Sequence, residues 1–277
     1  MSRTWLSFLV GSALAVLLII CVDIHIADAQ APIVPVVGYT QDFNTLANTA
    51  GVTLATNLPT GWTFVESGTS VRNNSAYAVG DGSSNAGDTY SFGAAGSTDR
   101  AFGGLMSSSL VYTLGVQLQN ATGSTVGQLS ITYYCEHWRQ GTAGRVDRLD
   151  FQYSTDATSL ATGTWTDVNA LDCPGTDTGS VGAKDGNTLR QQISNAITGL
   201  NLANGATIWL RWVEFNATLA DDGLALDDLT ITASSPNAIT LRALGASSGL
   251  PGWLAIAPVA GFLAVGGLGL LRLRHRV

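Results

Sequence analysis

Between residues 30 and 249, short runs rich in Val, Ile, Thr and aromatic residues alternate with breaks made of Gly, Asn, Asp and Ser. None of these runs shows a convincing helical period. The pattern is typical of strands joined by turns, and it predicts an all-β sandwich or barrel. A length of about 220 residues suits one large domain with a sizeable core, or two small ones. The Gly-rich stretch 80–104 fits either short strands or long loops.

Residues 129–138 form the clearest predicted strand, because their apolar and polar side chains alternate. One face carries Leu129, Ile131, Tyr133 and Cys135, and the other carries Ser130, Thr132, Tyr134, Glu136 and Trp138. Residues 110–118 and 149–153 alternate in the same way. Residues 207–215 are apolar on both faces and therefore predict a central strand, and residues 224–232 predict the last strand.

The N-terminal 29 residues have the pattern of a secretory signal peptide. Arg3 is the only charge in the first 22 residues, an apolar core follows, and Ala27-Asp28-Ala29 offers a cleavage site before Gln30. Two alternatives are a lipoprotein signal, raised by Cys21, and an uncleaved N-terminal membrane helix. The signal peptide predicts export.

The C-terminal end predicts a membrane anchor. Residues 250–271 form an almost uncharged apolar run, and three arginines, Arg272, Arg274 and Arg276, follow it directly. A run of about 20 apolar residues can span a bilayer as a helix, with the arginines on the cytoplasmic side. The predicted organisation is a β-domain at 30–233, a linker at 234–249 and a transmembrane anchor with an Arg-rich tail at 250–277.

This tail, which begins with Leu250-Pro251-Gly252-Trp253, resembles the tripartite sorting tails of bacterial surface proteins, such as PEP-CTERM tails. The motif is neither Pro-Glu-Pro nor the sortase motif, so a retained single-pass anchor is the alternative. In both cases the ectodomain lies outside the cytoplasm, at the cell surface or in the envelope.

The charge balance limits the partners. Between residues 30 and 249 there are 18 acidic and 9 basic residues, which gives a net charge of −9, and Lys184 is the single lysine of the chain. No basic patch is evident, and this argues against a nucleic-acid partner. The acidic composition is compatible with bound divalent cations.

Two cysteines, Cys135 and Cys173, remain after signal cleavage. In an oxidising compartment they predict a disulfide, with a pair of free buried thiols as the alternative. The bond would close a loop of about 37 residues and stabilise the fold by ~4 kcal/mol in the chain-entropy model. With two cysteines and no spaced histidine cluster, a zinc site is not expected.

Residues 221–231, Asp-Asp-Gly-Leu-Ala-Leu-Asp-Asp-Leu-Thr-Ile, form the strongest motif. They resemble the closing strand of jelly-roll domains such as MAM domains and carbohydrate-binding modules, which implies a jelly-roll-like sandwich. In a regular strand Asp227 shares a face with Leu229 and Ile231, so it would point into the core. A buried carboxylate needs a cation or several hydrogen-bond donors.

In similar jelly rolls an acid of the last strand helps to hold a structural calcium together with residues of the first strand. The resemblance therefore implies a calcium site with the ligands Asp42, Asn44, Asp227 and Asp228, since Ca²⁺ prefers oxygen ligands. The alternative is that Asp227 caps loop amides or pairs with an arginine.

A longer resemblance covers roughly residues 39–233. Its motifs are Leu58-Pro59-x-Gly61-Trp62 and those at residues 87–93, 136–139, 145–154 and 221–228. They look like a recurrent module of bacterial secreted proteins, found alone with a sorting tail or appended to secreted hydrolases. The resemblance attaches no activity to a named residue. This chain departs from the module in having both Cys135 and Cys173, which favours their being bonded to each other.

Aromatic and charged residues near the predicted strand 129–138 suggest a glycan-binding face. An exposed Trp138 could stack on a sugar ring while charged neighbours bind its hydroxyls. The predicted ligand-binding residues are Tyr134, Glu136, Trp138, Arg139 and Arg148. The alternative is that Trp138 packs in the sandwich above an ion pair between Glu136 and either Arg148 or Arg145.

Catalytic motifs are weakly represented. His137 is the only histidine between the predicted signal and anchor, it falls on the core-like face, and no Gly-x-Ser-x-Gly motif occurs. Only three glutamates lie in the domain, Glu66, Glu136 and Glu214, although many aspartates do. The sequence predicts a non-catalytic surface module that binds glycan or protein or serves as envelope structure. The alternative is a glycan-active hydrolase on the same fold.

Overall fold

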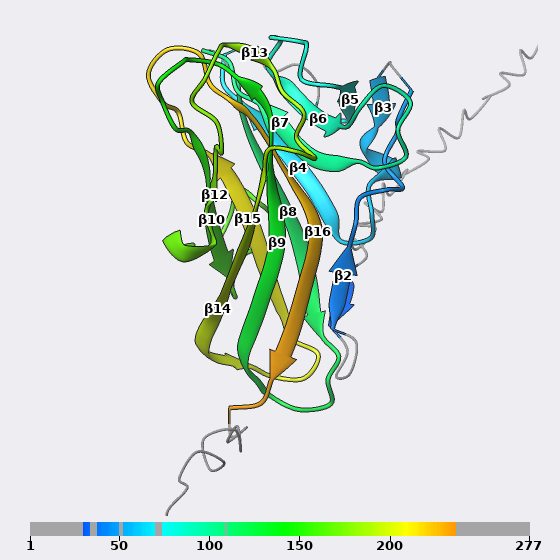
Figure 1. Ribbon diagram of the computed structural model, residues 1–277. Helices are drawn as coiled ribbons and strands as arrows, with labels where there is room; N and C mark the ends of the chain where they lie inside the picture. The colour runs from blue at the N-terminus through cyan, green and yellow to red at the C-terminus, as the bar shows by residue number, and fades with distance from the viewer. Residues whose placement is uncertain (1–29, 34–37, 50–51, 70–73, 109, 237–277) are drawn as a thin grey trace, which may run out of the picture. The chain divides into compact units, whose positions relative to one another are not determined.

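The computed structural model describes residues 30–33, 38–49, 52–69, 74–108 and 110–236 (Figure 1). These residues form sixteen strands and two 3-10 turns, η1 (Ala55–Asn57) and η2 (Asn169–Leu171). The strands make two sheets that face each other across a shared core. The prediction of an all-β sandwich is therefore confirmed.

The first sheet has seven strands, and β8 and β15 lie at its centre. β8 pairs with β1, β4 and β15, and β15 also pairs with β10; β1 pairs with β8 in the parallel sense. β10 in turn pairs with β11 and β12. The strands are β1 (Ala31–Ile33), β4 (Trp62–Ser67), β8 (Val111–Asn120), β10 (Arg148–Ser154), β11 (Thr166–Asp167), β12 (Cys173–Pro174) and β15 (Thr207–Glu214).

The second sheet has nine strands, and two of its long strands, β9 and β16, run side by side (Figure 1). β14 and β13 pair with the other edge of β9, whereas β2 and β7 pair with β16. The strands are β2 (Tyr39–Gln41), β3 (Val52–Leu54), β5 (Ala76–Gly80), β6 (Asp88–Phe92), β7 (Ala101–Leu105), β9 (Val126–Gln140), β13 (Gly182–Ala183), β14 (Arg190–Leu202) and β16 (Gly223–Ser234).

The core between the sheets is centred on Trp212 of β15, which is fully buried. Its ring stacks on Trp62 and meets Tyr133 and Phe151 edge-on, with centroid distances of 5.9, 5.6 and 5.0 Å. Tyr133 lies on the face of β9 that the alternation predicted to be apolar. That predicted face is confirmed, because Leu129, Ile131, Tyr133 and Cys135 all belong to the core.

The predicted order of the later strands is also confirmed. β15, predicted to be central, lies between β8 and β10, and β16 is the last strand of the described chain. The stretch 80–104 contains the two short strands β6 and β7, whose residues are all buried. β6 is buried on both faces and β7 contains two glycines, so neither shows an alternation of apolar and polar side chains, and the sequence is compatible with strands or with loops.

One face assignment is wrong, because β16 is not a regular strand. Asp227 pairs with Tyr134 and Thr230 pairs with Thr132, so β16 has one residue more than β9 over this interval. This is a β-bulge, and Asp228 occupies it with a positive φ of 49°. A bulge reverses the alternation, so Leu226 and Leu229 both face the core. Asp227 instead shares the opposite face of the sheet with Ala225 and is still buried.

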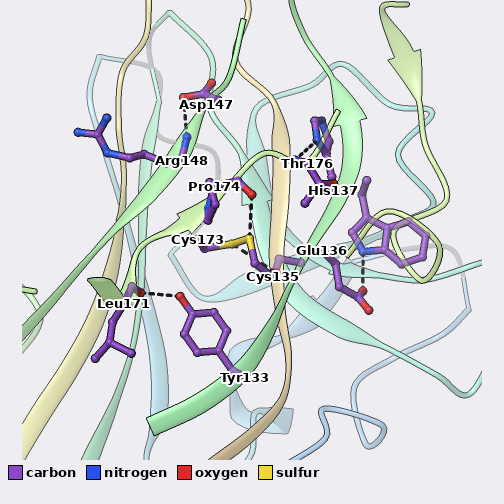
Figure 2. The surroundings of a disulfide bond; sticks show 12 residues. Tyr133, Cys135, Glu136, His137, Asp147, Arg148, Leu171, Cys173, Pro174 and Thr176 are labelled. Carbon is purple, nitrogen blue, oxygen red and sulfur yellow. Dashed lines mark hydrogen bonds between the residues drawn. A yellow bond between two sulfur atoms is a disulfide. The ribbon is translucent and has the colours of Figure 1, made fainter. Parts of the chain in front are cut away.

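A disulfide between Cys135 and Cys173 joins the two sheets (Figure 2). Cys135 belongs to β9 and Cys173 to β12, and their Cα atoms lie 5.2 Å apart. The Tyr133 hydroxyl donates a hydrogen bond of 2.6 Å to the Leu171 carbonyl oxygen beside this bond. The predicted pairing is confirmed, and it adds a covalent link to the apolar and hydrogen-bonded contacts between the sheets.

The predicted signal peptide and C-terminal anchor lie outside the described residues. Within the described ranges, no helix has the length and hydropathy that a membrane crossing requires.

Candidate functional site

A wide groove opens at the end of the sandwich where β9 and β15 finish and β16 begins. Its volume is about 900 Å³. One wall is the loop that joins β15 to β16, and the other comes from the turn after β7 and the end of β9. The residues that line it are Asn85, Leu105, Met106, Ser107, Ser108, Arg139, Gly141, Val181, Asn216, Ala217, Thr218, Leu219, Ala220 and Asp221.

The lining combines apolar contact surface with hydrogen-bonding groups, most of them neutral. Val181 and Leu219 are exposed by 57% and 81%, which is unusual for large aliphatic side chains. Amide and hydroxyl groups come from Asn85, Asn216 and Thr218. The Arg139 guanidinium is held at the rim, because its Nη1 donates hydrogen bonds to the carbonyl oxygens of residues 82 and 83.

Three buried acids lie close together at the β15–β16 loop. Asp147 immediately precedes β10, Glu214 ends β15, and Asp221 lies in the loop. The start of β10 meets the end of β15 because the two strands are antiparallel, with Leu149 opposite Glu214. One ligand oxygen from each acid lies within 4.8 Å of the others, and the three form the one such group of His, Cys, Asp or Glu side chains among the described residues.

Arg145 is the cation that contacts this acid cluster, defined as Asp147, Glu214 and Asp221. Its Nη2 lies 3.0 Å from Asp147 Oδ2 and 3.8 Å from Asp221 Oδ1. The same guanidinium donates hydrogen bonds to the carbonyl oxygens of Thr218 and Ala220 in the loop. Arg145 therefore holds the groove wall as well as two of the acids.

Glu214 is the acid of the cluster whose carboxylate oxygens are least satisfied by hydrogen bonds. It is 4% exposed, and neither of its carboxylate oxygens makes a well-aligned hydrogen bond to another described residue. The Tyr112 phenol adjoins it, but the Tyr112 hydroxyl oxygen is likewise without a well-aligned hydrogen bond. Burial, followed by the charge of Asp147, raises the pKa of Glu214 well above its usual range. A buried carboxylate left in this state is costly.

Asp222, next to the cluster, fastens the loop to β9. Its Oδ1 accepts hydrogen bonds from the Gly141 amide at 2.7 Å and from Gln140 Nε2 at 3.2 Å. Gly141 permits this approach, because a Cβ there would collide with the Asp221 carbonyl oxygen. Burial raises the pKa values of Asp221 and Asp222 to about 6.

His137 is buried and held by backbone groups on both sides (Figure 2). Its Nδ1 accepts from the amides of Thr176 and Asp177, and its Nε2 lies 2.9 Å from the Arg139 carbonyl oxygen. This pattern assigns the proton to Nε2. Desolvation lowers the pKa of His137. The imidazole is thus a structural group on the core-like face, as the alternation predicted.

Among the predicted calcium ligands, the three acids Asp42, Asp227 and Asp228 do not form a compact group of the kind that Asp147, Glu214 and Asp221 form within the described residues. Asp42 and Asp228 line one shallow hollow between β2 and β16. Asn44 Oδ1 accepts the Arg100 amide at 2.9 Å. Asp227 is buried, and desolvation and then the neighbouring Glu136 raise its pKa to about 8. Calcium binding by these residues stays a prediction.

The expectation of an exposed Trp138 is wrong. Trp138 is 2% exposed and stacks on Phe92 at 5.9 Å, and Gly186 packs against its ring. Its Nε1 donates a hydrogen bond of 2.9 Å to Glu136 Oε2. The outer face of the second sheet therefore has a small apolar cluster of its own, which the residue pattern of β9 alone did not reveal.

The predicted ion pairs of Glu136 are also wrong. Arg148 pairs with Asp150 at 2.6 Å, and Arg145 belongs to the acid cluster. Burial raises the pKa of Glu136 to about 7, and the Trp138 hydrogen bond opposes that rise. Glu136 is therefore a buried acid with one unpaired oxygen, Oε1.

The remaining predicted ligand-binding residues are dispersed. Arg139 lines the groove, whereas the half-buried Tyr134 lies along β9 beneath the Arg190 guanidinium, which is 4.2 Å from its ring centroid. Arg148 belongs to the other sheet and lies over Phe215 at 4.1 Å. The structure thus brings one of the five predicted residues, Arg139, to the groove.

The sequence reasoning missed the acid cluster. Asp147 and Asp221 stand inside motifs that were singled out, and Glu214 is one of three glutamates in the domain. Two features of the sequence could have pointed to Glu214: glutamate is rare in the domain, and this glutamate ends a strongly apolar strand. Spacing gave no clue, because 67 residues separate Asp147 from Glu214.

Comparison with known proteins finds no matching family model and no matching curated protein. Among solved structures, a cleaved adhesin domain of Lys-gingipain from Porphyromonas gingivalis is 13% identical; the match covers 63% of this chain and 93% of that one, with a TM-score of 0.35. The CBM22-1 xylan-binding domain from Paenibacillus barcinonensis is 12% identical, covering 68% and 97%, with a TM-score of 0.31. A family 35 carbohydrate-binding module from Clostridium thermocellum is 9% identical, covering 67% and 99%, with a TM-score of 0.29. None of these likenesses assigns a function to this chain.

Proposed function

We propose that this chain is an exported, membrane-anchored surface module that binds glycan in the groove beside the β15–β16 loop. The observation that carries the proposal is the lining of the groove. Its amide, hydroxyl and guanidinium groups can hydrogen-bond to sugar hydroxyls, and the exposed Val181 and Leu219 offer contact to the apolar faces of sugar rings. Its volume lies within the usual range for small-ligand sites.

Binding is favoured over glycoside hydrolysis by the acids that the groove presents. Hydrolysis ordinarily uses two carboxyl groups that flank the scissile bond. Among the described residues that line the groove, Asp221 is the one acid, and it is 5% exposed. The jelly-roll topology, export and the C-terminal anchor belong to the same proposal. The disulfide between the sheets supports export, because such bonds persist in oxidising compartments.

A glycan array probed with the purified full-length protein tests this function. We expect binding to a subset of glycans, followed by a measurable affinity in calorimetry. Arg139→Met should weaken that affinity roughly 10-fold, since a charged hydrogen bond at the rim contributes about 1.5 kcal/mol or more. Arg148→Met, which changes an arginine outside the groove, should leave it unchanged.

An array without any bound glycan would overturn the proposal. Release of reducing sugar from a bound glycan would show instead that the protein is a glycan-active hydrolase.

A further inference from the structure

We propose that Asp147, Glu214 and Asp221 form a calcium site that fixes the β15–β16 loop. The first step of the argument is distance. One oxygen from each acid lies within 4.8 Å of the others. Calcium–oxygen bonds are about 2.4 Å long, so two oxygens bound to one ion are at most about 5 Å apart. The cluster therefore has the dimensions of a single cation site.

The second step is the unpartnered carboxylate of Glu214. Both of its oxygens are buried, and within the described residues their polar neighbour is the Tyr112 phenol, without a well-aligned hydrogen bond, whereas Asp147 and Asp221 accept hydrogen bonds from backbone amides and lie beside Arg145. A carboxylate with two free oxygens can bind Ca²⁺ in the bidentate manner. The acid whose oxygens are least satisfied within the protein is thus the one best able to hold an ion.

The third step is charge. When all three acids are ionised, as calcium binding requires, the acids and the Arg145 guanidinium together carry a net charge of −2 in a buried place. A divalent cation makes the sum zero. The donor set consists of oxygen atoms alone, which suits calcium rather than zinc or copper. This site is distinct from the hollow between β2 and β16 that contains Asp42 and Asp228.

Calcium titration of the full-length protein, after dialysis against EDTA, tests the site. We expect one bound ion per chain and a rise in melting temperature of roughly 5 °C at a calcium concentration about 100-fold above the dissociation constant. Glu214→Gln keeps the shape of the side chain but removes its charge, so it should lower the affinity by at least ~100-fold and abolish the rise. Asp221→Asn, in the loop, should also reduce the calcium affinity and the calcium-induced rise in melting temperature.

Glu136→Gln is the matched control, because Glu136 is a second buried glutamate with an unpaired oxygen, outside the cluster. It should leave the calcium-induced rise intact. The proposal is overturned if calcium does not raise the wild-type melting temperature, or if Glu214→Gln and Asp221→Asn retain the full rise. It is also overturned if Asp227→Asn or Asp228→Asn abolishes the rise, since the ion would then lie at the junction of β2 and β16. The calcium titration does not depend on glycan binding. A failure of the calcium site can therefore be told apart from a failure of the proposed glycan-binding function.

Discussion

Trp212 shows how much a single side chain contributes to this sandwich. It is fully buried and contacts aromatic rings from both sheets. We expect Trp212→Ala to lower the free energy of unfolding by about 3–5 kcal/mol, because the cavity cannot collapse without moving both sheets. Chemical denaturation measures this loss. Trp165→Ala changes a peripheral tryptophan that lies under Arg211 and should cost much less; equal losses would contradict this account.

Glu136 should make the stability of the protein depend on pH. Its pKa is raised to about 7 in the fold, so the folded chain holds a proton there that the unfolded chain has lost above pH ~4.5. The free energy of unfolding should therefore fall as pH rises from about 5 to 8, by up to roughly 3 kcal/mol from this group.

Glu136→Gln removes the titration while keeping an acceptor for the Trp138 indole, so it should flatten that part of the slope. Urea denaturation at pH 5 and pH 8 compares the two proteins. A slope that is the same in both would show that Glu136 does not titrate in this range.

Residue exposure was the least predictable property of the candidate site. Trp138 occupies the predicted face of β9, but the sequence gave no sign that Phe92 and the segment around Gly186 cover that face. Alternation identifies the two faces of a strand and does not say whether a further layer packs on the polar one. The sugar-stacking hypothesis for Trp138 depended on that missing information.

At the scale of elements, the bulge in β16 determines which side chains of this strand face the core and places Asp228 in a positive-φ conformation. Asp228 has a positive φ, which costs a residue with a Cβ about 1 kcal/mol or more. We expect Asp228→Gly and Asp228→Asn to leave stability unchanged within about 1 kcal/mol, because both residues tolerate this conformation and the exposed Arg190 contact at 3.8 Å contributes little.

Asp228→Val should destabilise the protein by about 1–3 kcal/mol, since a β-branched side chain is strained at this φ. Thermal denaturation of the three variants gives the comparison. Stability in Asp228→Val equal to that in Asp228→Asn would indicate that the bulge relaxes into a regular strand.

Strands with regular alternation were predictable, and strands with interruptions were not. β8, β9, β10, β15 and β16 were all expected from the sequence, with ends shifted by a few residues. β14 was missed although it pairs along most of β9, because it is interrupted near Gly199 and its buried residues, Ile193, Ile197, Leu200 and Leu202, do not alternate evenly. The bulge in β16 has the same effect, and it reversed the predicted orientation of Asp227.

For the whole molecule, the disulfide is the covalent link between the two sheets. The double replacement Cys135→Ala with Cys173→Ala should lower the free energy of unfolding by about 4 kcal/mol. Without the bond, which joins cysteines 38 residues apart in the sequence, the unfolded chain has more conformational entropy. Reducing agent should destabilise the wild type by a similar amount and leave the double variant unaffected. A double variant as stable as the oxidised wild type would contradict this role.

The central place of β16 also governs when folding can be completed. The strand is the last of the described chain, yet it lies between β9 on one side and β2 and β7 on the other. While the chain emerges from the ribosome, these three partners are made first and have no common neighbour to join them. The second sheet therefore closes only after synthesis has passed residue 234. Earlier intermediates expose strand edges, so they need protection from aggregation.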